Sequence, residues 1–322
     1  MQYRTLGRTN QSVSLVGMGT GGHDPLGLKS GRPEAEMVAL LHRAFDLGIN
    51  LFDTSPGYGS GRSETILGRA LQALPREDLL VSTKIPLAGS MGGEPPKLMK
   101  AADVGPAVDE SLQRLQLDHV DIMLIAVADQ PEYYDTVVDS LIPELHKQKE
   151  LGKIRFIGSS EQTRSDGAHS WLQRVLSADV VDVVMVGHNM INQSARHSIF
   201  PTCSADNIGV VNIFTVRNLF WDATRLKEVL DDLVRRQLLT PDETGDHPAL
   251  DWLLQEADCE TLVEAAYRYA AYTEPVSTVM CGTIKIEELE ENIPGIEKGP
   301  LPTAAIERLH RTFGHIAEAI GN

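Results

Sequence analysis

Eight short runs rich in Val, Ile, Leu and Met recur along the chain, and most are separated by segments with helical periodicity. Such nearly continuous apolar runs are typical of parallel strands buried on both faces. Eight strands alternating with helices predict an α/β fold, the (β/α)8 or TIM barrel. The predicted strands are residues 12–17, 49–52, 79–83, 120–125, 154–158, 181–186, 208–214 and 276–281.

The predicted helices have apolar residues at intervals of three and four, which buries one face of each helix. They span residues 34–47, 62–74, 104–115, 137–151, 260–272 and 303–320. Gly48 and Gly152 stand where helix C-caps are expected. We therefore predict one barrel domain that covers residues 1–322.

Two additions to the barrel are expected. Residues 3–14, with Gly7-Arg-Thr-Asn in the middle, predict an N-terminal β-hairpin that closes the base of the barrel. Residues 217–258 are too long for an ordinary connection after the seventh strand and contain one helical pattern at 223–236. A long loop at that end of a barrel usually covers a ligand.

The net charge of −16 argues against nucleic acid or an anionic membrane as partner, because both require basic patches. The chain has no apolar run of about 18 residues, and its first residues lack the apolar core of a signal peptide. Its 3 cysteines show no metal-binding spacing. We expect a cytoplasmic protein that takes a small molecule and holds no metal; the oligomeric state cannot be predicted.

Three polar residues follow two successive predicted strands, where a parallel barrel keeps its active site. Asp53 ends one strand, Tyr58 lies on the turn after it, and Lys84 ends the next strand. A phenol is a weak acid at neutral pH, and a neighbouring ammonium favours its ionised form. An aspartate would keep that lysine charged and oriented. Together the three side chains would form a general acid/base.

These residues lie in Asp53-Thr-Ser-Pro-Gly-Tyr and Ser82-Thr-Lys, and the chain resembles the aldo-keto reductase family over nearly its whole length. The resemblance implies a (β/α)8 barrel that binds NADP(H), or less commonly NAD(H), in extended form. It implies that Tyr58 is the proton donor, that Lys84 tunes it, and that Asp53 is the partner of Lys84. The adenosine end is implied to lie on Gly282, Lys285, Glu291 and Asn292, and Gly19 and Thr20 are implied to contact the cofactor.

Several positions depart from the family pattern. Ala126 stands where the family has its catalytic histidine, and Ser159-Ser160 stands where a Ser-Asn pair usually holds the carboxamide. Met185 replaces a glutamine, and Ile213, followed by Phe214, replaces the aromatic residue that stacks on the nicotinamide. His23 and His188 are candidates to replace the missing histidine in the substrate pocket, although a lone histidine is more often structural. Glu287 and Glu288 stand where basic residues would favour NADP(H).

These features predict an NAD(P)-dependent oxidoreductase that reduces a carbonyl, or oxidises a secondary alcohol, of a small polar metabolite such as a sugar. The loss of the histidine leaves a second hypothesis open, in which the Tyr–Lys pair performs elimination, isomerisation or dehydration. A third hypothesis is a non-enzymatic NADP(H)-binding sensor subunit, and the intact Asp–Tyr–Lys set argues against it. Ala126 is either an introduced substitution or a natural one.

Overall fold

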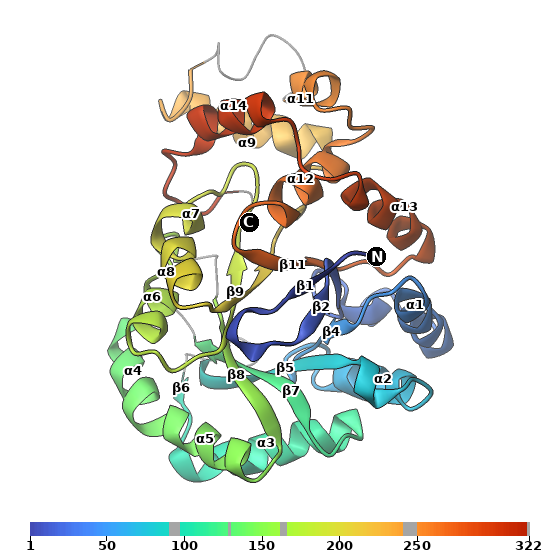
Figure 1. Ribbon diagram of the computed structural model, residues 1–322, viewed down its shortest axis with the longest axis vertical. Helices are drawn as coiled ribbons and strands as arrows, with labels where there is room; N and C mark the ends of the chain where they lie inside the picture. Colours follow the sequence, from blue (N-terminus) through green and yellow to red (C-terminus); the bar gives the residue numbers. More distant parts are fainter. Residues whose placement is uncertain (90–96, 128–129, 162–165, 241–249, 321–322) are drawn as a thin grey trace.

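A closed barrel of eight parallel strands forms the centre of the computed structural model, which describes residues 1–89, 97–127, 130–161, 166–240 and 250–320. The strands neighbour one another in the order in which they follow along the chain, and β4 pairs with both β3 and β5 (Figure 1). They are β3 (Val16–Gly19), β4 (Leu51–Asp53), β5 (Leu80–Gly89), β7 (Val120–Val127), β8 (Ile154–Ser160), β9 (Val183–Gly187), β10 (Gly209–Ile213) and β11 (Val276–Cys281). The predicted barrel is therefore confirmed.

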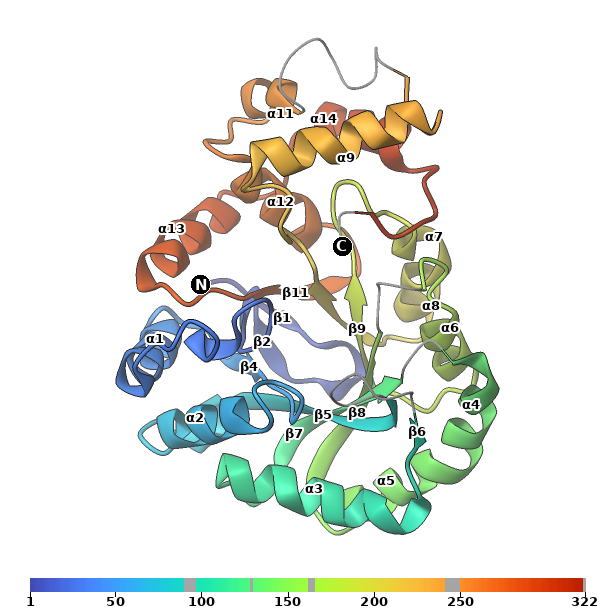
Figure 2. The ribbon, with the colours of Figure 1, turned by 180° about the vertical axis from the view of Figure 1, so that it is seen from behind.

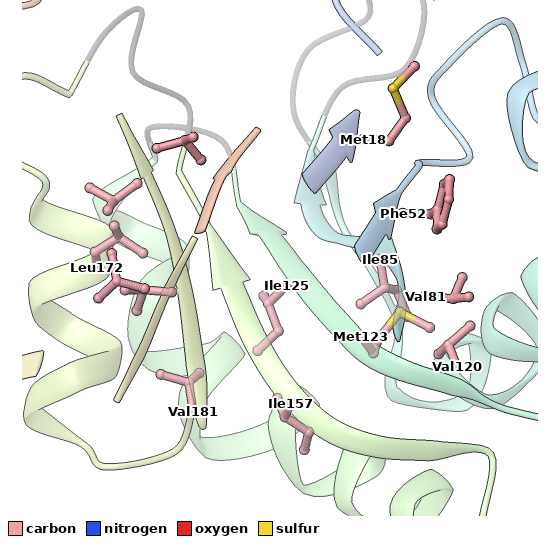
Figure 3. Close-up of a cluster of buried hydrophobic side chains, with 14 of the residues drawn as sticks. Met18, Phe52, Val81, Ile85, Val120, Met123, Ile125, Ile157, Leu172 and Val181 are labelled. Atoms are coloured by element: carbon pink, nitrogen blue, oxygen red, sulfur yellow. The ribbon is translucent and has the colours of Figure 1, made fainter. Parts of the chain in front are cut away.

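Side chains alternate between the two faces of each barrel strand, as the two-residue period of a strand requires. Leu80, Leu124 and Met185 belong to a small cluster that fills the barrel interior. Their neighbours, such as Val81 and Ile125, point outward and pack beneath the helices (Figure 3). The period therefore decides which residues can reach the mouth of the barrel.

The helices that follow the strands form the outer layer (Figures 1 and 2). Gly48 and Gly152 end two of these helices with φ of 91° and 76°, as the sequence predicts for C-caps. The helices are α1 (Glu34–Asp46), α2 (Arg62–Leu71), α3 (Ala101–Leu115), α4 (Pro131–Thr136), α5 (Ile142–Glu150), α6 (Ser170–Ser177), α7 (Ala195–Ser198), α8 (Phe200–Ala205), α9 (Ala223–Arg235), α11 (Asp251–Glu256), α12 (Leu262–Ala271), α13 (Ile286–Glu297) and α14 (Thr303–Phe313).

The segment after β10 forms a second layer of helices at one end of the molecule, where α9, α11 and α14 lie together (Figure 2). Its apolar cluster includes Leu226 of α9, Leu253 of α11 and Leu309 of α14. The Asp222 side chain caps α9 by accepting a hydrogen bond of 3.0 Å from the Arg225 amide. Residues 241–249 of the predicted long loop lie outside the described residues.

The prediction of one strand over residues 12–17 is wrong, because this segment contains parts of two different strands. Ser12–Ser14 is β2, which pairs with β1 (Tyr3–Thr5) to form the predicted hairpin, and the barrel strand begins only at Val16. The Ser14 hydroxyl donates to the Val16 carbonyl at 2.7 Å, at the point where the chain leaves the hairpin. The last helix ends at Phe313 instead of residue 320.

Candidate active site

Asp53 and Lys84 form a buried ion pair at the mouth of the barrel. The Lys84 Nζ lies 2.6 Å from Asp53 Oδ2 and 2.9 Å from the Thr54 carbonyl oxygen. The Ser82 hydroxyl donates to Asp53 Oδ1 at 2.8 Å, so both carboxylate oxygens accept a hydrogen bond. Asp53 ends β4 and pairs in register with Ser82 of β5, which brings these groups to one level of the barrel.

The pKa of Lys84 is raised above its ordinary value even though the side chain is buried. Burial is the largest single effect and would lower the pKa, but the charge of Asp53, the interaction with Tyr58 and the hydrogen bonds of the ammonium with both residues outweigh it. Lys84 is therefore a cation at neutral pH. The sequence predicts Lys84 at the end of its strand, whereas β5 continues past it to Gly89 and pairs with β7 as far as Ala88.

Tyr58 stands over this cation. The Lys84 Nζ lies 4.9 Å from the centroid of the Tyr58 ring. A turn places the ring, because the Tyr58 amide donates to the Ser55 carbonyl at 3.0 Å. The structure thus brings together Asp53, Tyr58 and Lys84.

Gly21 is a residue of the site that the sequence analysis missed. A Cβ on Gly21 would lie 2.4 Å from Cζ and 2.9 Å from the hydroxyl oxygen of Tyr58. Real Cβ atoms do not approach ring atoms so closely, so only glycine lets the chain pass beside the phenol. The signal that could have found it is the glycine-rich run Gly19-Thr20-Gly21-Gly22, of which only Gly19 and Thr20 are assigned to the cofactor from the sequence.

Ala126 lies near the end of β7, opposite Pro86 of β5 and Ser160 of β8. The alternation along β7 turns Leu124 into the barrel, so Ala126 faces the same interior one level closer to the mouth. The side chain at this position, a methyl group, is therefore directed toward the barrel interior. The neighbouring residues 128–129 lie outside the described residues.

Ser159 and Ser160 face opposite sides of the barrel wall. The Ser159 hydroxyl accepts a hydrogen bond of 2.7 Å from the Trp171 indole of α6, so it points outward into the helical layer. Ser160 therefore points inward. It pairs in register with Met185, which also lines the interior. Of the two serines, only Ser160 faces the barrel interior.

Ile213 and Phe214 also lie in different environments. Ile213 packs with the interior cluster, whereas Phe214 is 36% exposed and has a φ of 60°. The Arg217 guanidinium stacks on the Phe214 ring, 3.7 Å from the ring centroid. The residue that faces the barrel interior is therefore Ile213, which offers an apolar surface in place of an aromatic face.

Gly19, the last residue of β3, and Thr20, which follows it, lie beside Asp53 of β4. The Thr20 amide and hydroxyl both donate to the Asp53 carbonyl at 2.9 Å, and the Thr20 hydroxyl accepts from Ser63 at 2.7 Å. Thr20 is 1% exposed. Its role in the structure is to hold the loop that carries Gly21 beside the strand that carries Asp53.

The predicted adenosine residues follow β11 and extend from Gly282 to the middle of α13. The Lys285 Nζ forms an ion pair of 2.6 Å with Glu288 Oε1, and the Thr283 hydroxyl donates to the other oxygen of Glu288. Glu291 is exposed on α13, and Asn292 donates to the Cys281 thiol at 3.8 Å. Gly282 is exposed after the strand. A carboxylate thus faces the lysine at the predicted adenosine end.

The two candidate replacements for the histidine occupy different environments. His23 is exposed in the loop after β3, two residues from Gly21. His188 is fully buried, with its ring 5.1 Å from Phe200 and 5.2 Å from Tyr269 between centroids. Burial, together with the charges of Arg196 and His310, lowers the pKa of His188 to about 3. His188 thus belongs to the packing between barrel and helices.

The donor set at the mouth suits an uncharged, amide-bearing aromatic ring, because Ser160 offers a hydroxyl and Met185 and Ile213 offer apolar surface. Among the described residues, no group of three or more His, Cys, Asp or Glu side chains could hold a metal ion. The same residues include no helix that is long and apolar enough to cross a membrane.

Comparisons with known proteins agree with this geometry. A model of the aldo/keto reductase family matches residues 16–312. The chain is 31% identical over 309 residues to an L-galactose dehydrogenase of Arabidopsis thaliana, covering 92% of this chain and 88% of that protein. It is 26% identical over 297 residues to an NADH-specific methylglyoxal reductase of Escherichia coli, covering 81% of this chain and 88% of that protein.

A solved structure has the same fold. The holo form of the aldo-keto reductase AKR11C1 from Bacillus halodurans superimposes with a TM-score of 0.73 at 23% identity. The match covers 97% of this chain and 96% of that chain. The barrel described above is therefore shared over essentially its full length.

Proposed function

Since this chain belongs to the aldo/keto reductase family and is an oxidoreductase, we propose that it interconverts a carbonyl and a secondary alcohol on a small polar metabolite, with Tyr58 as general acid/base. The observation that carries this proposal is the buried Asp53–Lys84 ion pair beneath the Tyr58 ring. In this arrangement the phenol of Tyr58 is held beside the fixed positive charge of Lys84.

The nicotinamide, when bound, supplies or receives the hydride. In the reductive direction the Tyr58 hydroxyl donates its proton to the carbonyl oxygen. The Lys84 ammonium stabilises the phenolate that remains, because opposite charges within about 4–6 Å favour the ionised form. Asp53 keeps Lys84 charged and in place through the 2.6 Å contact. In the oxidative direction the same groups accept the proton from the alcohol.

We propose that Ser160, Met185 and Ile213 contact the nicotinamide and that the start of α13 holds the adenosine. The Glu288 carboxylate already binds Lys285 and would repel a 2′-phosphate. A carboxylate can instead accept a hydrogen bond from a ribose hydroxyl. We therefore expect NAD(H) to be the better cofactor, which replaces the preference for NADP(H) drawn from the resemblance. The relative named NADH-specific supports this choice.

A sugar is the substrate class that we propose, because the chain resembles an L-galactose dehydrogenase over most of its length. Ala126 leaves room near the mouth that a histidine would fill, which suits a polyol larger than a simple aldehyde. The test is to follow the absorbance of reduced nicotinamide with purified protein, each cofactor, and a panel of aldoses and small aldehydes. Turnover of an aldose with NAD⁺ supports the proposal; no turnover with any substrate and either cofactor contradicts it.

A further inference from the structure

Glu161, His169 and Ser194 form a hydrogen-bonded series that the redox chemistry does not use. The Ser194 Oγ lies 2.8 Å from His169 Nε2. The other ring nitrogen, Nδ1, is hydrogen-bonded to Glu161 Oε2. The Gly187 amide donates to Glu161 Oε1 at 2.6 Å, so both carboxylate oxygens are held. A hydroxyl, an imidazole and a carboxylate in this order form a nucleophile, a base and a group that orients the base.

The three side chains come from two loops, one between β8 and α6 and the other between β9 and α7. Glu161 follows β8, His169 precedes α6, and Ser194 precedes α7. Glu161 and His169 are 5% and 2% exposed, whereas Ser194 is partly exposed. The base and its orienting carboxylate are thus shielded from water, and the hydroxyl is the member nearest to solvent.

The backbone of His169 supports a functional reading. Its φ is 57°, in the left-handed region that residues with a side chain rarely adopt. This conformation is what lets the ring reach Glu161 on one side and Ser194 on the other. Unfavourable backbone conformations of this kind cluster at functional sites.

An open hollow adjoins the series. Its enclosed part has room for about one water molecule, it opens to the solvent, and its lining includes His169, Ser194, Asn192, Phe214 and Arg217. The Arg217 guanidinium brings a positive charge to this lining, stacked on the ring of Phe214. Tyr58 and Lys84 do not contribute to it. The Ser194 hydroxyl and the Arg217 side chain therefore line the same opening to the solvent, at a place other than the redox centre.

We propose that Ser194, His169 and Glu161 form a hydrolytic site for small carboxylic esters, lactones included. The Ser194 Oγ attacks the ester carbonyl carbon while His169 Nε2 accepts the hydroxyl proton. The C–O bond to the alcohol breaks, and His169 returns the proton to the leaving oxygen. Water then attacks the acyl group with His169 as base, which releases the carboxylic acid and restores the serine. Arg217 stabilises the negative charge on the carbonyl oxygen of the tetrahedral intermediate.

Glu161 is a positioning residue in this scheme, because it acts through His169. Burial raises the pKa of its carboxyl, while the hydrogen bonds from His169 and Gly187 act in the opposite direction. It fixes the tautomer in which Nδ1 carries the proton and Nε2 is free to accept one. This activity goes beyond the proposed oxidoreduction and needs no nicotinamide.

The test uses p-nitrophenyl acetate and the full chain without added cofactor. Ser194→Ala should lower the rate of p-nitrophenol release by about 10²-fold or more, as loss of a nucleophile does. Ser177→Ala, on the exposed end of α6, is the matched control and should keep the wild-type rate. Glu161→Gln should lower kcat and leave KM unchanged. Equal rates in wild type and Ser194→Ala would overturn the proposal.

A second measurement does not depend on how the variants fold. A fluorophosphonate should add once to the wild-type chain, with loss of fluoride, and peptide mass spectrometry should place the adduct on Ser194. Denatured protein should not react. Absence of an adduct, or an adduct on another residue, would overturn the proposal.

Discussion

Lys84 Nζ lies 2.6 Å from Asp53 Oδ2, with the side chains only 10% and 6% exposed. Two charges shielded from water in this way depend on each other, because removing one leaves the other buried and unpaired. In the account given above, this pair holds the positive charge that the phenolate of Tyr58 needs. The Asp53–Lys84 pair therefore contributes both to the stability of the barrel mouth and to the acid/base chemistry of Tyr58.

The first prediction concerns the stability of this pair. Asp53→Asn should lower the free energy of unfolding by about 3–5 kcal/mol, as breaking a buried ion pair does. Asp231→Asn makes the same chemical change in an exposed pair, in which Lys227 Nζ lies 2.5 Å from Asp231 Oδ2. This control should lower the free energy of unfolding by only about 0–1 kcal/mol. Denaturant unfolding of both variants measures the difference. Equal losses would show that the Asp53–Lys84 pair is not a buried, dependent one.

The second prediction concerns Ala126. If the barrel is a reductase that lacks its histidine, Ala126→His should raise the reduction of simple aldehydes, since one added donor to the developing oxyanion is often worth about 10²–10³-fold. Reduction rates with the nicotinamide cofactor measure this. If the true substrate occupies the space beside Ala126, the same variant should lose activity toward that substrate. An unchanged rate with every aldehyde would contradict the placement of Ala126 beside the reacting carbonyl.

The third prediction tests the cofactor. Glu288→Arg should shift the ratio of kcat/KM for NADPH over NADH by about tenfold or more, because it replaces a repulsive charge with one that can bind a 2′-phosphate, and a hydrogen bond to a charged group contributes about 1.5–3 kcal/mol. Glu287→Arg makes the same charge change at an exposed neighbouring residue. An equal shift in both variants would mean that net charge, rather than a contact at Glu288, sets the preference.

The fourth prediction concerns acid stability. The pKa of His188 falls from 6.5 to about 3 on burial, so the unfolded chain binds one more proton than the folded chain between these pH values. The contribution of neutral His188 is therefore complete above pH 6.5 and is lost as the pH falls toward 3. His188→Leu should flatten the dependence of Tm on pH in this range.

His146→Leu, at an exposed position of α5, is the control for that experiment. Its slope of Tm against pH should match that of the wild type. A His188→Leu variant whose Tm falls as steeply with acid as the wild type would show that another group governs acid unfolding.

The sequence predicts the barrel well because its signal is local and repeated. Several strands, such as Val120–Val127, are nearly continuous apolar runs, and Gly48 and Gly152 mark helix ends with the positive φ that favours glycine. The junction near Ser14 was missed because a hairpin strand and a barrel strand follow each other with one residue between them. No periodicity separates two strands that close together.

The site was predictable in part for the same reason. Asp53 pairs in register with Ser82 on the adjacent strand, and Lys84 follows two residues later on the same face, so their contact follows from the strand assignment. The orientations of Ser159 and Phe214 did not follow, because a shift of one residue along a strand moves a side chain to the other face. The hydrogen-bonded series of Glu161, His169 and Ser194 could not be predicted from the sequence either, since it joins loops that follow different strands and gives no local pattern.

The central claim is that the Tyr58 hydroxyl transfers the proton in a nicotinamide-dependent reaction. The most direct test is the absorbance of reduced nicotinamide during turnover by wild type and by Tyr58→Phe, which removes one oxygen atom from the ring. We predict that kcat falls by about 10²–10⁴-fold, the usual contribution of a general acid/base, while the affinity for the cofactor is unchanged. A Tyr58→Phe variant that turns over as fast as the wild type would contradict the account.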